Sequence, residues 1–392
     1  MGAAAALVEV PTRAASDYLV RVDHDWESAA AGYDAAERED ARTPFQGQIV
    51  LDSWYRAMAT RADLEPVLLS VSDARTGALA LHLPLVRLRR GMVRVLAFAD
   101  QELIDYNAPV LGPAAPRDAE GAAALWRMLR AKLPGADLIE LRKMPLTIRD
   151  RPNPLAFLRT LPCELNGNLV RIGDAYDAYL RGGIKRLVRK ELERSWRVFS
   201  RHPEASFRAI VGSQDRMRVL AAIEHQQPIR MGLARKSYAL DAPEPAEFYR
   251  RLVEVDPTGD TVVLLALAAG DEIVAALLGL REAGRFTMIR ISSSTDAAWT
   301  NCSPGRLVIE RSMAHLHAEG VREFDFSVGN YDYKRRFGVE PVPLVDVVRP
   351  LTPLGLAGAA RAQGRAWLRT HPELETRMRR LLGRASAQEA AP

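Results

Sequence analysis

The same order of elements is predicted twice along this chain, and this repeat limits the possible folds more than any other feature. Each copy reads as two strands joined by a polar turn, a third strand, a helix and a short closing strand. The strand pairs are VLLSVSDARTGALALHLPLV from Val67 and VVLLALAAGDEIVAALLGL from Val262. The helices, Ala119–Leu133 and Pro304–Glu319, are each followed by a glycine that can supply a left-handed C-cap. This pattern predicts two copies of one α/β unit, each with a mixed central sheet flanked by helices.

The repeat divides the chain into a first unit at 17–165, a second unit at 166–350 and a tail at 351–392. A proline-rich stretch, RDRPNPLAFLRTLPCE, lies at the boundary between the units. Further helices are predicted at Asp25–Glu39, Gly47–Thr60, Tyr176–Ser200, Gln214–Gln226 and Glu244–Glu254. The tail holds a last helix that is expected to end near Leu382, and it carries seven arginines and three glutamates. A solvated basic helix is the favoured interpretation, and contact with an anionic membrane or nucleic acid is the alternative.

Cysteine content and hydropathy set the expected compartment. Cys163 and Cys302 are the only cysteines among 392 residues, so no disulfide framework is possible and a reducing cytoplasm is expected. The first twenty residues lack the basic segment of a signal peptide, and no apolar run approaches the ~18 residues of a spanning helix. The chain is mildly basic, with a sequence pI near 9.3.

The start of the second repeat helix, in the run TNCSPGRL, is a candidate phosphate site. The N-terminus of a helix presents free backbone N–H groups and a partial positive charge. Ser303 can cap the helix, Pro304 suits its first turn, Gly305 allows close approach of a ligand, and Arg306 adds a cationic donor. An ordinary capped helix is the alternative. The corresponding helix start in the first unit is acidic, which predicts that the first unit has no such site.

Other nucleotide sites and a cysteine nucleophile are not supported. Neither a G-x-x-x-x-G-K-[ST] loop nor a G-x-G-x-x-G run after a strand occurs in the sequence. Cys302 precedes the helix start, where a thiol can have a lowered pKa. However, His315 lies 13 residues further along the same helix, roughly 20 Å away at 1.5 Å per residue. A distant base such as His225 stays open.

Polar residues follow the closing strand of the second unit, in the run DFSVGNYDYKRRFG. Asp325 is expected on one face of the strand, with Phe324 and Phe326 on the other. Tyr331, Tyr333 and Lys334 come next, at the end of a sheet where α/β proteins bind ligands. A phenol can protonate a leaving thiolate, and an ammonium can stabilise an oxyanion. The alternative is that the tyrosines pack in the core and the lysine is solvated.

Two further groups of residues are candidates for binding an acceptor substrate. The strand-end run Asp105, Tyr106 and Asn107 of the first unit would face a cleft between the units. The predicted helix at Lys185–Arg201 carries seven basic residues, among them Lys185 and Arg189, which suit an anionic acceptor. Its alternative is a solvated helix with i,i+4 ion pairs. His225 is included as a third contact. No RNA-binding motif supports a nucleic-acid partner.

The combination of S-P-G, helix, Gly, F-D-F-x-x-G and Y-K resembles the GNAT acyltransferase superfamily. It resembles most the CelD-type branch, which is associated with cellulose biosynthesis and related to the Fem aminoacyltransferases. TPFQGQIVLDSWYRAM, LALHLPLV, DYNAPVLGP and YLRGGIKRLVRKELERSWRVF also resemble this branch. The resemblance covers about 17–350 and leaves out the tail. It implies two tandem GNAT-like units, the first one degenerate.

The resemblance also implies acyl-CoA chemistry without a metal. The pyrophosphate of acetyl-CoA or another acyl-CoA would lie at Ser303–Arg306, and a splayed strand at Met288–Ser292 would hold the pantetheine, with Ser292 as a contact. Lys334 would support the tetrahedral intermediate, Tyr331 or Tyr333 would be the acid, and Asp325 would belong to the same site. TNCSPG differs from the usual Q/R-x-x-G-x-G/A phosphate loop and offers fewer backbone donors.

The acceptor implied by the resemblance is an amine or hydroxyl of a small molecule or a cell-envelope or glycan precursor. One alternative is a Fem-like transferase that uses an aminoacyl-tRNA. The other is a non-catalytic binding module with the same fold. The sequence does not indicate an oligomeric state.

Overall fold

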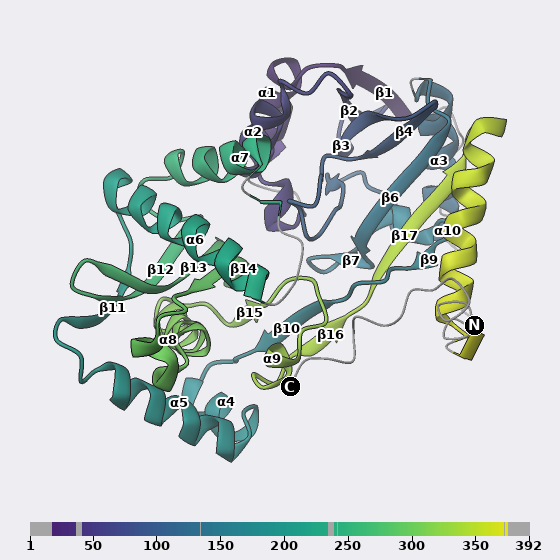
Figure 1. Cartoon of the computed structure of the whole chain (residues 1–392). Helices are drawn as coiled ribbons and strands as arrows, with labels where there is room; N and C mark the ends of the chain where they lie inside the picture. The colour runs from purple at the N-terminus through teal and green to yellow at the C-terminus, as the bar shows by residue number, and fades with distance from the viewer. Residues whose placement is uncertain are drawn as a thin grey trace, which may run out of the picture.

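The protein is described from a computed structural model, which covers residues 18–36, 41–133, 135–233, 239–240, 242–371 and 373–374. Within this part of the chain, the strands form two large mixed sheets and one short hairpin, β7 (Thr147–Ile148) with β8 (Arg151–Pro152). Helices flank both sheets, and the two units lie side by side (Figure 1).

The first sheet has the strand order β1-β2-β3-β4-β6-β17-β9, and β5 pairs with β3. Its members are β1 (Tyr18–Asp23), β2 (Leu64–Asp73), β3 (Leu79–Arg90), β4 (Val93–Phe98), β5 (Val110–Leu111), β6 (Leu138–Pro145), β9 (Leu161–Pro162) and β17 (Leu344–Pro350). β2, β3 and β4 form an antiparallel meander, and β6 runs parallel to β4 after the crossover helix α3 (Ala119–Lys132).

The second sheet repeats this arrangement in the order β11-β12-β13-β14-β15-β10-β16. Its members are β10 (Gly167–Arg171), β11 (Ala205–Ala209), β12 (Val262–Ala269), β13 (Glu272–Glu282), β14 (Arg285–Ser293), β15 (Glu323–Asp325) and β16 (Glu340–Val342). β12, β13 and β14 form the meander, and β15 runs parallel to β14 after α8 (Pro304–Ala318). The predicted repeat is therefore present in the structure, strand for strand.

The first sheet is completed by a strand from the end of the second unit. β10, the first strand of the second unit, pairs antiparallel with β15 of its own sheet. β17, at the end of the second unit, pairs antiparallel with β6 of the first sheet, and Figure 1 shows it running beside β6. Sheet pairing thus differs from the predicted boundaries in one strand, since 344–350 was assigned to the second unit. Hydrogen bonding across the sheet, rather than position in the chain, decides where β17 lies.

Most of the remaining helices begin and end close to the predicted residues. The remaining helices are α1 (Trp26–Ala36), α2 (Gln48–Met58), α4 (Tyr176–Gly182), α5 (Arg186–Phe199), α6 (Ser213–Leu233), α7 (Pro243–Glu254), α9 (Asp332–Arg335) and α10 (Leu356–Arg369), with short 3-10 turns at Pro44–Gln46, Pro154–Phe157, Ala297–Cys302 and Pro353–Gly355. α9 was not predicted, and α10 ends at Arg369, before the end predicted near Leu382. The prediction of a single helix over Tyr176–Ser200 is wrong, because the helix is interrupted at Gly183, between α4 and α5. α6 also continues past Gln226. The end predicted near Leu382 lies outside the described residues.

Apolar side chains of both units meet in one core. Trp54 and Met58 of α2 belong to the same buried cluster as Phe248 and Leu252 of α7. These residues come from different units, so the contact between the units is an extension of their interiors. Burial of such large apolar side chains, at about 25 cal/mol per Å² of apolar surface, holds the units together.

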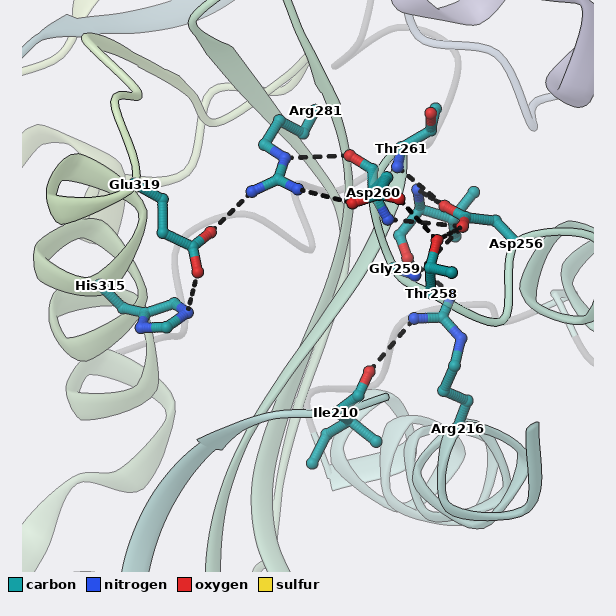
Figure 2. Close-up of polar contacts among 11 residues, drawn as sticks. Ile210, Arg216, Asp256, Thr258, Gly259, Asp260, Thr261, Arg281, His315 and Glu319 are labelled. Carbon is teal, nitrogen blue, oxygen red and sulfur yellow. Dashed lines mark hydrogen bonds and ion pairs between the residues drawn. The ribbon is translucent and has the colours of Figure 1, made fainter. Parts of the chain in front are cut away.

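The buried carboxylate of Asp256 holds the loop before β12 in place through hydrogen bonds (Figure 2). Asp256 accepts hydrogen bonds from the Thr258 hydroxyl and from backbone N–H groups that include those of Thr261 and Val262, at 2.7–2.8 Å. Arg216, also buried, donates to the carbonyls of Ile210 and Val262. Burial raises the pKa of Asp256, but these backbone and hydroxyl bonds outweigh it and leave the pKa below its ordinary value.

Arg281 joins this loop to α8. Its guanidinium donates to the Asp260 carbonyl at 2.9 Å and to Glu319 at 2.6 Å, and Glu319 lies 3.1 Å from His315 (Figure 2). His315 therefore contacts the C-terminal end of its own helix and cannot serve Cys302. Among the described helices, none is long and apolar enough to cross a membrane.

Candidate functional site

A pocket of about 270 Å³ lies at the start of α8, where the sequence predicted a phosphate site. Its lining combines the first turn of α8 with the end of β14 and with one residue each from α6 and α9. The lining residues are Arg230, Ile291, Ser293, Thr295, Ser303, Pro304, Gly305, Arg306, Ile309 and Tyr333. The first turn of a helix has N–H groups without an intrahelical acceptor, so this pocket suits an anion. In the first unit, Asp118 instead caps α3 by accepting from the Gly121 N–H at 2.8 Å.

Gly305 is needed at this position because the pocket is narrow there. A Cβ on Gly305 would lie 3.3 Å from the Ser293 hydroxyl and 3.6 Å from a guanidinium nitrogen of Arg230. Arg230 was missed by the sequence analysis because the predicted helix ended at Gln226, one turn short. Its exposed guanidinium is the cation that faces the start of α8 most directly.

Ser303 and Arg306 both line the pocket, but Ser303 does not cap the helix with its side chain. Ser303 adopts a left-handed backbone with φ of 46°, and its side chain makes no cap hydrogen bond to the helix. Its hydroxyl accepts from Arg306 at 3.0 Å, and Arg306 also donates to Glu191 of α5 at 3.0 Å. Arg306 is therefore held at the rim as part of an ion pair, and the predicted capping role of Ser303 is wrong.

Ser292 lies on the other face of β14. Its hydroxyl donates to Gln226 of α6 at 2.8 Å, whereas the adjacent Ser293 lines the pocket. Successive side chains of a strand point to opposite faces, so a prediction shifted by one residue selects the wrong face. Ser293 replaces Ser292 as the candidate contact.

β14 and β15 separate next to this pocket. Their parallel pairing ends at Thr287 and Asp325, while β14 continues to Ser293. The register between β13 and β14 also shifts at this point, because Leu278 pairs with Arg290 and Gly279 with Met288. Ile289 is thus the extra residue of a bulge. The predicted splayed strand at Met288–Ser292 is present, and it leaves one edge of β14 without a neighbouring strand.

A buried polar cluster joins the two units beyond the fork, which is the point at which β14 and β15 separate. The Tyr106 hydroxyl donates to Asp325 at 2.8 Å, and the Ser327 N–H donates to the same carboxylate oxygen at 2.7 Å. The Ser327 hydroxyl donates to Asp105. Burial raises the pKa of Asp325 to about 6, and it also raises the pKa of Asp105. Asp105 and Tyr106, predicted on the acceptor side, therefore contact the predicted catalytic segment.

Lys334 lies at this cluster, buried on the short helix α9. Its ammonium donates to the carbonyl of Val328 at 2.7 Å and of Ser327 at 3.3 Å, and it lies 5.4 Å from the centre of the Tyr331 ring. Burial lowers the pKa of Lys334 to about 8, opposed by Asp105 and Asp325. The solvated lysine of the alternative interpretation is excluded.

The two tyrosines differ in exposure. Tyr331 is 44% exposed, whereas Tyr333 is largely buried and lines the pocket at α8. Their rings stack with 6.1 Å between centroids. Burial raises the pKa of Tyr333 to about 12, so its phenol is protonated at neutral pH. Tyr333 is the better placed of the two to contact a ligand in the pocket, and Tyr331 lies beside Lys334.

Other predicted contacts lie elsewhere. Asn107 donates to Asp100 and to the Arg142 carbonyl, and so holds the loop after β4. Lys185 is exposed at the start of α5, and Arg189 donates to the Leu180 carbonyl, which joins α5 to α4. His225 is exposed beside a different pocket on α6.

Cys302 is buried, with its sulfur 3.1 Å from the Trp299 carbonyl. Burial raises the pKa of its thiol, which is the reverse of an activated nucleophile. The geometry thus agrees with the expectation that Cys302 is not catalytic. None of the described residues forms a group that could hold a metal ion.

The pocket lies within the part of the chain that matches a known protein-family model. Residues 186–335 match the model of the acetyltransferase (GNAT) domain. This range holds α8, the fork of β14 and β15, and the segment from Asp325 to Lys334. A search of curated proteins finds no matching relative.

Solved structures show the same fold over most of the chain. FemX matches with a TM-score of 0.56 at 9% identity, covering 83% of this chain and 96% of FemX. A conserved protein of unknown function from Bacteroides thetaiotaomicron matches with a TM-score of 0.50 at 11% identity, covering 84% and 99%. A tandem GNAT protein from the clavulanic acid biosynthesis pathway matches with a TM-score of 0.44 at 12% identity, covering 86% and 99%.

These identities show the fold alone. Because the first unit repeats the meander, crossover helix and parallel strand of the matched domain, the predicted fold class of two tandem GNAT-like units is confirmed.

Proposed function

We propose that this protein transfers an acyl group from an acyl-CoA to an amine or hydroxyl acceptor, with the donor bound in the second unit. The observation that carries the proposal is the pocket at the start of α8, which opens beside the fork between β14 and β15. A phosphate pocket next to an unpaired strand edge suits a ligand with a charged end and a peptide-like arm. Acyl-CoA has both, since pyrophosphate and pantetheine lie in series.

In this proposal, the pyrophosphate lies against the first turn of α8. The Gly305 backbone and the Arg230 guanidinium provide donors, and Arg306 is held at the rim by Glu191. The pantetheine lies along the edge of β14 that β15 does not cover, from Ser293 back toward the bulge at Ile289, where it would take the place of the Gln227 side chain that donates to the Ile291 carbonyl at 3.0 Å. The thioester is thereby brought toward the cluster around Asp325 and Lys334.

The chemical step is direct attack of the acceptor on the thioester carbonyl. The new bond to nitrogen or oxygen forms, the carbonyl electrons move to oxygen, and collapse of this intermediate expels the CoA thiolate. The Lys334 ammonium stabilises the oxyanion, and the Tyr331 phenol, whose ring centre lies 5.4 Å from that ammonium, supplies the proton that the thiolate takes. Tyr333 contacts the pyrophosphate end of the donor. The proton released by the acceptor passes to solvent.

The acceptor is proposed to enter from the first unit, whose Asp105 and Tyr106 reach the polar cluster. The resemblance to the CelD-type branch favours a glycan or cell-envelope precursor in the cytoplasm. Nothing in the site's geometry selects a particular acceptor, so the donor is the first property to test.

The direct test is binding of acetyl-CoA, succinyl-CoA and a long-chain acyl-CoA by calorimetry and thermal shift. Ligand at one hundred times its dissociation constant stabilises the folded protein by about 2.7 kcal/mol. Arg230→Ala is expected to weaken binding, because it removes the cation facing Gly305. Arg127→Ala, an exposed arginine on α3 of the first unit, is the matched control. Absence of binding by all three thioesters would refute the proposed donor.

A second donor, an aminoacyl-tRNA, is favoured by one feature. α5 carries exposed cations, including Lys190 and Arg194, and it contacts the start of α8 through Glu191 and Arg306. Binding that is released by moderate salt and abolished by Lys190→Ala with Arg194→Ala would support this donor, because phosphate-backbone contacts depend steeply on salt. The acyl-CoA proposal expects neither effect.

A further inference from the structure

A cavity larger than the pocket at α8 lies in the first unit, away from that pocket. It measures about 560 Å³ and is enclosed by β4, β6 and β17 on one side and by α10 on the other. In Figure 1, α10 lies along the edge of the first sheet beside β17 and β9. The acyl-transfer proposal makes no use of this cavity.

α10 is fixed over the sheet by small residues. A Cβ on Gly355 would lie 1.9 Å from the Asp137 carbonyl oxygen, and one on Gly358 would lie 2.8 Å from Leu138. Ala359 and Ala366 are buried. The helix is therefore an integral cover of the sheet, and its remaining face is held above the cavity.

The floor of the cavity is apolar. Val95, Leu138 and Val348 form a small buried cluster with Ala359 of α10, and Leu161 packs against it. Ile139 and Val347, the neighbours of Leu138 and Val348, belong to the core on the α3 side of the same sheet. The floor is thus a second, separate apolar face of the first sheet.

Six cationic and five acidic side chains, Glu102 and Asp346 among the acids, line the cavity and leave it with a formal net charge of +1. Glu140 pairs with Arg90 and Arg142, Asp100 with Lys143, and Glu164 with Arg369. Arg361 and Arg365 also line the cavity, one turn apart on α10. Neither of these two makes an ion pair within the described residues.

Their exposed guanidiniums leave an uncompensated positive charge at the cavity rim, above an apolar floor. An anion bound there would form charge-assisted hydrogen bonds with both.

We infer that this cavity is a binding site for a small organic anion with a short apolar body and a phosphate or carboxylate head. The apolar body lies against Val93, Leu161 and Ala362, the partly exposed residues that pack on the buried cluster, and the head is held by Arg361 and Arg365. The site is independent of the acyl donor pocket.

The test is titration calorimetry with octanoate and octyl phosphate, below their critical micelle concentrations, on the full-length protein. At least one of the two is expected to bind, and the comparison shows which head group the arginines prefer. Arg361→Ala with Arg365→Ala is expected to weaken this binding at least tenfold. Arg127→Ala with Arg130→Ala, two exposed arginines on α3 across the sheet, is expected to leave it unchanged.

Three results would overturn the inference. The first is that neither anion binds. The second is that the neutral octyl glucoside binds as tightly as the anions, since the arginines would then contribute nothing. The third is binding to anionic vesicles without binding to monomeric octyl phosphate, which would indicate a membrane surface site. Ala362→Phe, which fills the cavity from α10, provides an independent variant that is expected to block the octyl chain while leaving acetyl-CoA binding intact.

Discussion

Lys334 is the residue on which the proposed chemistry depends most. Its buried ammonium donates hydrogen bonds to two carbonyl groups. The charges of the Asp105 and Asp325 carboxylates raise its pKa and partly oppose the effect of burial. A buried ammonium that forms no close ion pair is costly to fold around. Such a charge is better explained by a role in function than by a contribution to stability, and substitution can separate the two.

Lys334→Met keeps the side-chain length and removes the charge. We expect acyl transfer to fall by about 10²–10³, the usual effect of removing one oxyanion donor, with donor affinity nearly unchanged. Steady-state turnover with acetyl-CoA measures the first quantity and calorimetry the second. Full turnover in the variant would show that the ammonium has no part in the reaction. An unfolded variant would show instead that the carbonyl contacts of Lys334 hold α9 in place.

The same variant has a pH signature with two opposite signs. The pKa of Lys334 is about 8 in the folded protein and near 10.5 in an unfolded chain, so the unfolded chain binds more protons between these values. The contribution of Lys334 to the free energy of unfolding therefore rises with pH from about 8 to 10.5. Turnover needs the ammonium, so turnover falls as the pH rises through 8. Both slopes are expected to disappear in Lys334→Met, as followed by urea unfolding and by pH–rate profiles.

At the scale of single elements, the loop before β12 is the clearest case of a segment held by one side chain. The Asp256 carboxylate satisfies several backbone N–H groups at once, and Arg216 closes the same loop from α6 (Figure 2). Removing a buried acceptor leaves those donors without partners.

Asp256→Ala is expected to lower the free energy of unfolding by about 3 kcal/mol, the upper part of the range for a buried unsatisfied group. Chemical denaturation measures the loss. Asp271→Ala, at a fully exposed carboxylate that pairs with Arg218, is the control and is expected to change little. A loss in Asp256→Ala no larger than in the control would mean that water replaces the carboxylate in the loop.

Strands and helices with strong local patterns were predictable from the sequence. Which strands pair with one another in a sheet was not. The two meanders and the helices that begin at Ala119 and Pro304 are predicted from the spacing of apolar residues and from the glycines that mark turns and helix ends. The crossing of β17 into the first sheet has no local signal, because the sequence of a short apolar strand does not indicate which sheet the strand joins. The break at Gly183 was hidden inside an otherwise helical pattern.

The candidate site was predictable where chemistry follows the chain and not where it depends on facing side chains. Gly305, Tyr333 and Asp325 were found from a helix start and a strand end. Arg230 and Ser293 were missed, since one lies past a predicted helix end and the other requires knowing which face of β14 meets the pocket. The contact of Tyr106 with Asp325 joins residues 219 positions apart, and only the fold brings them together.

The two units are held together by β17, which joins the first sheet, and by the shared core around Trp54 and Phe248. Unfolding the second unit would remove β17 from the first sheet, and unfolding either unit would open that core. The two units are therefore expected to unfold in a single transition, in spite of their internal similarity.

Scanning calorimetry tests this expectation. One transition is expected, with the calorimetric enthalpy equal to the van't Hoff enthalpy. A destabilising change in the second unit, such as Asp256→Ala, should lower the melting temperature of the whole protein. Two resolved transitions, with only one of them shifted by the variant, would show that β17 and the shared core do not couple the units.

The position of β17 has a consequence for how the protein is made. β6 is synthesised early, but its partner β17 is not available until the ribosome has produced the whole second unit. At ~5–20 residues per second, that delay is on the order of 10–40 s. During this time the nascent first sheet presents an open edge, which is a template for pairing with other chains. The yield of correctly assembled protein in the cell should then depend on the chaperones that cover β6 during translation.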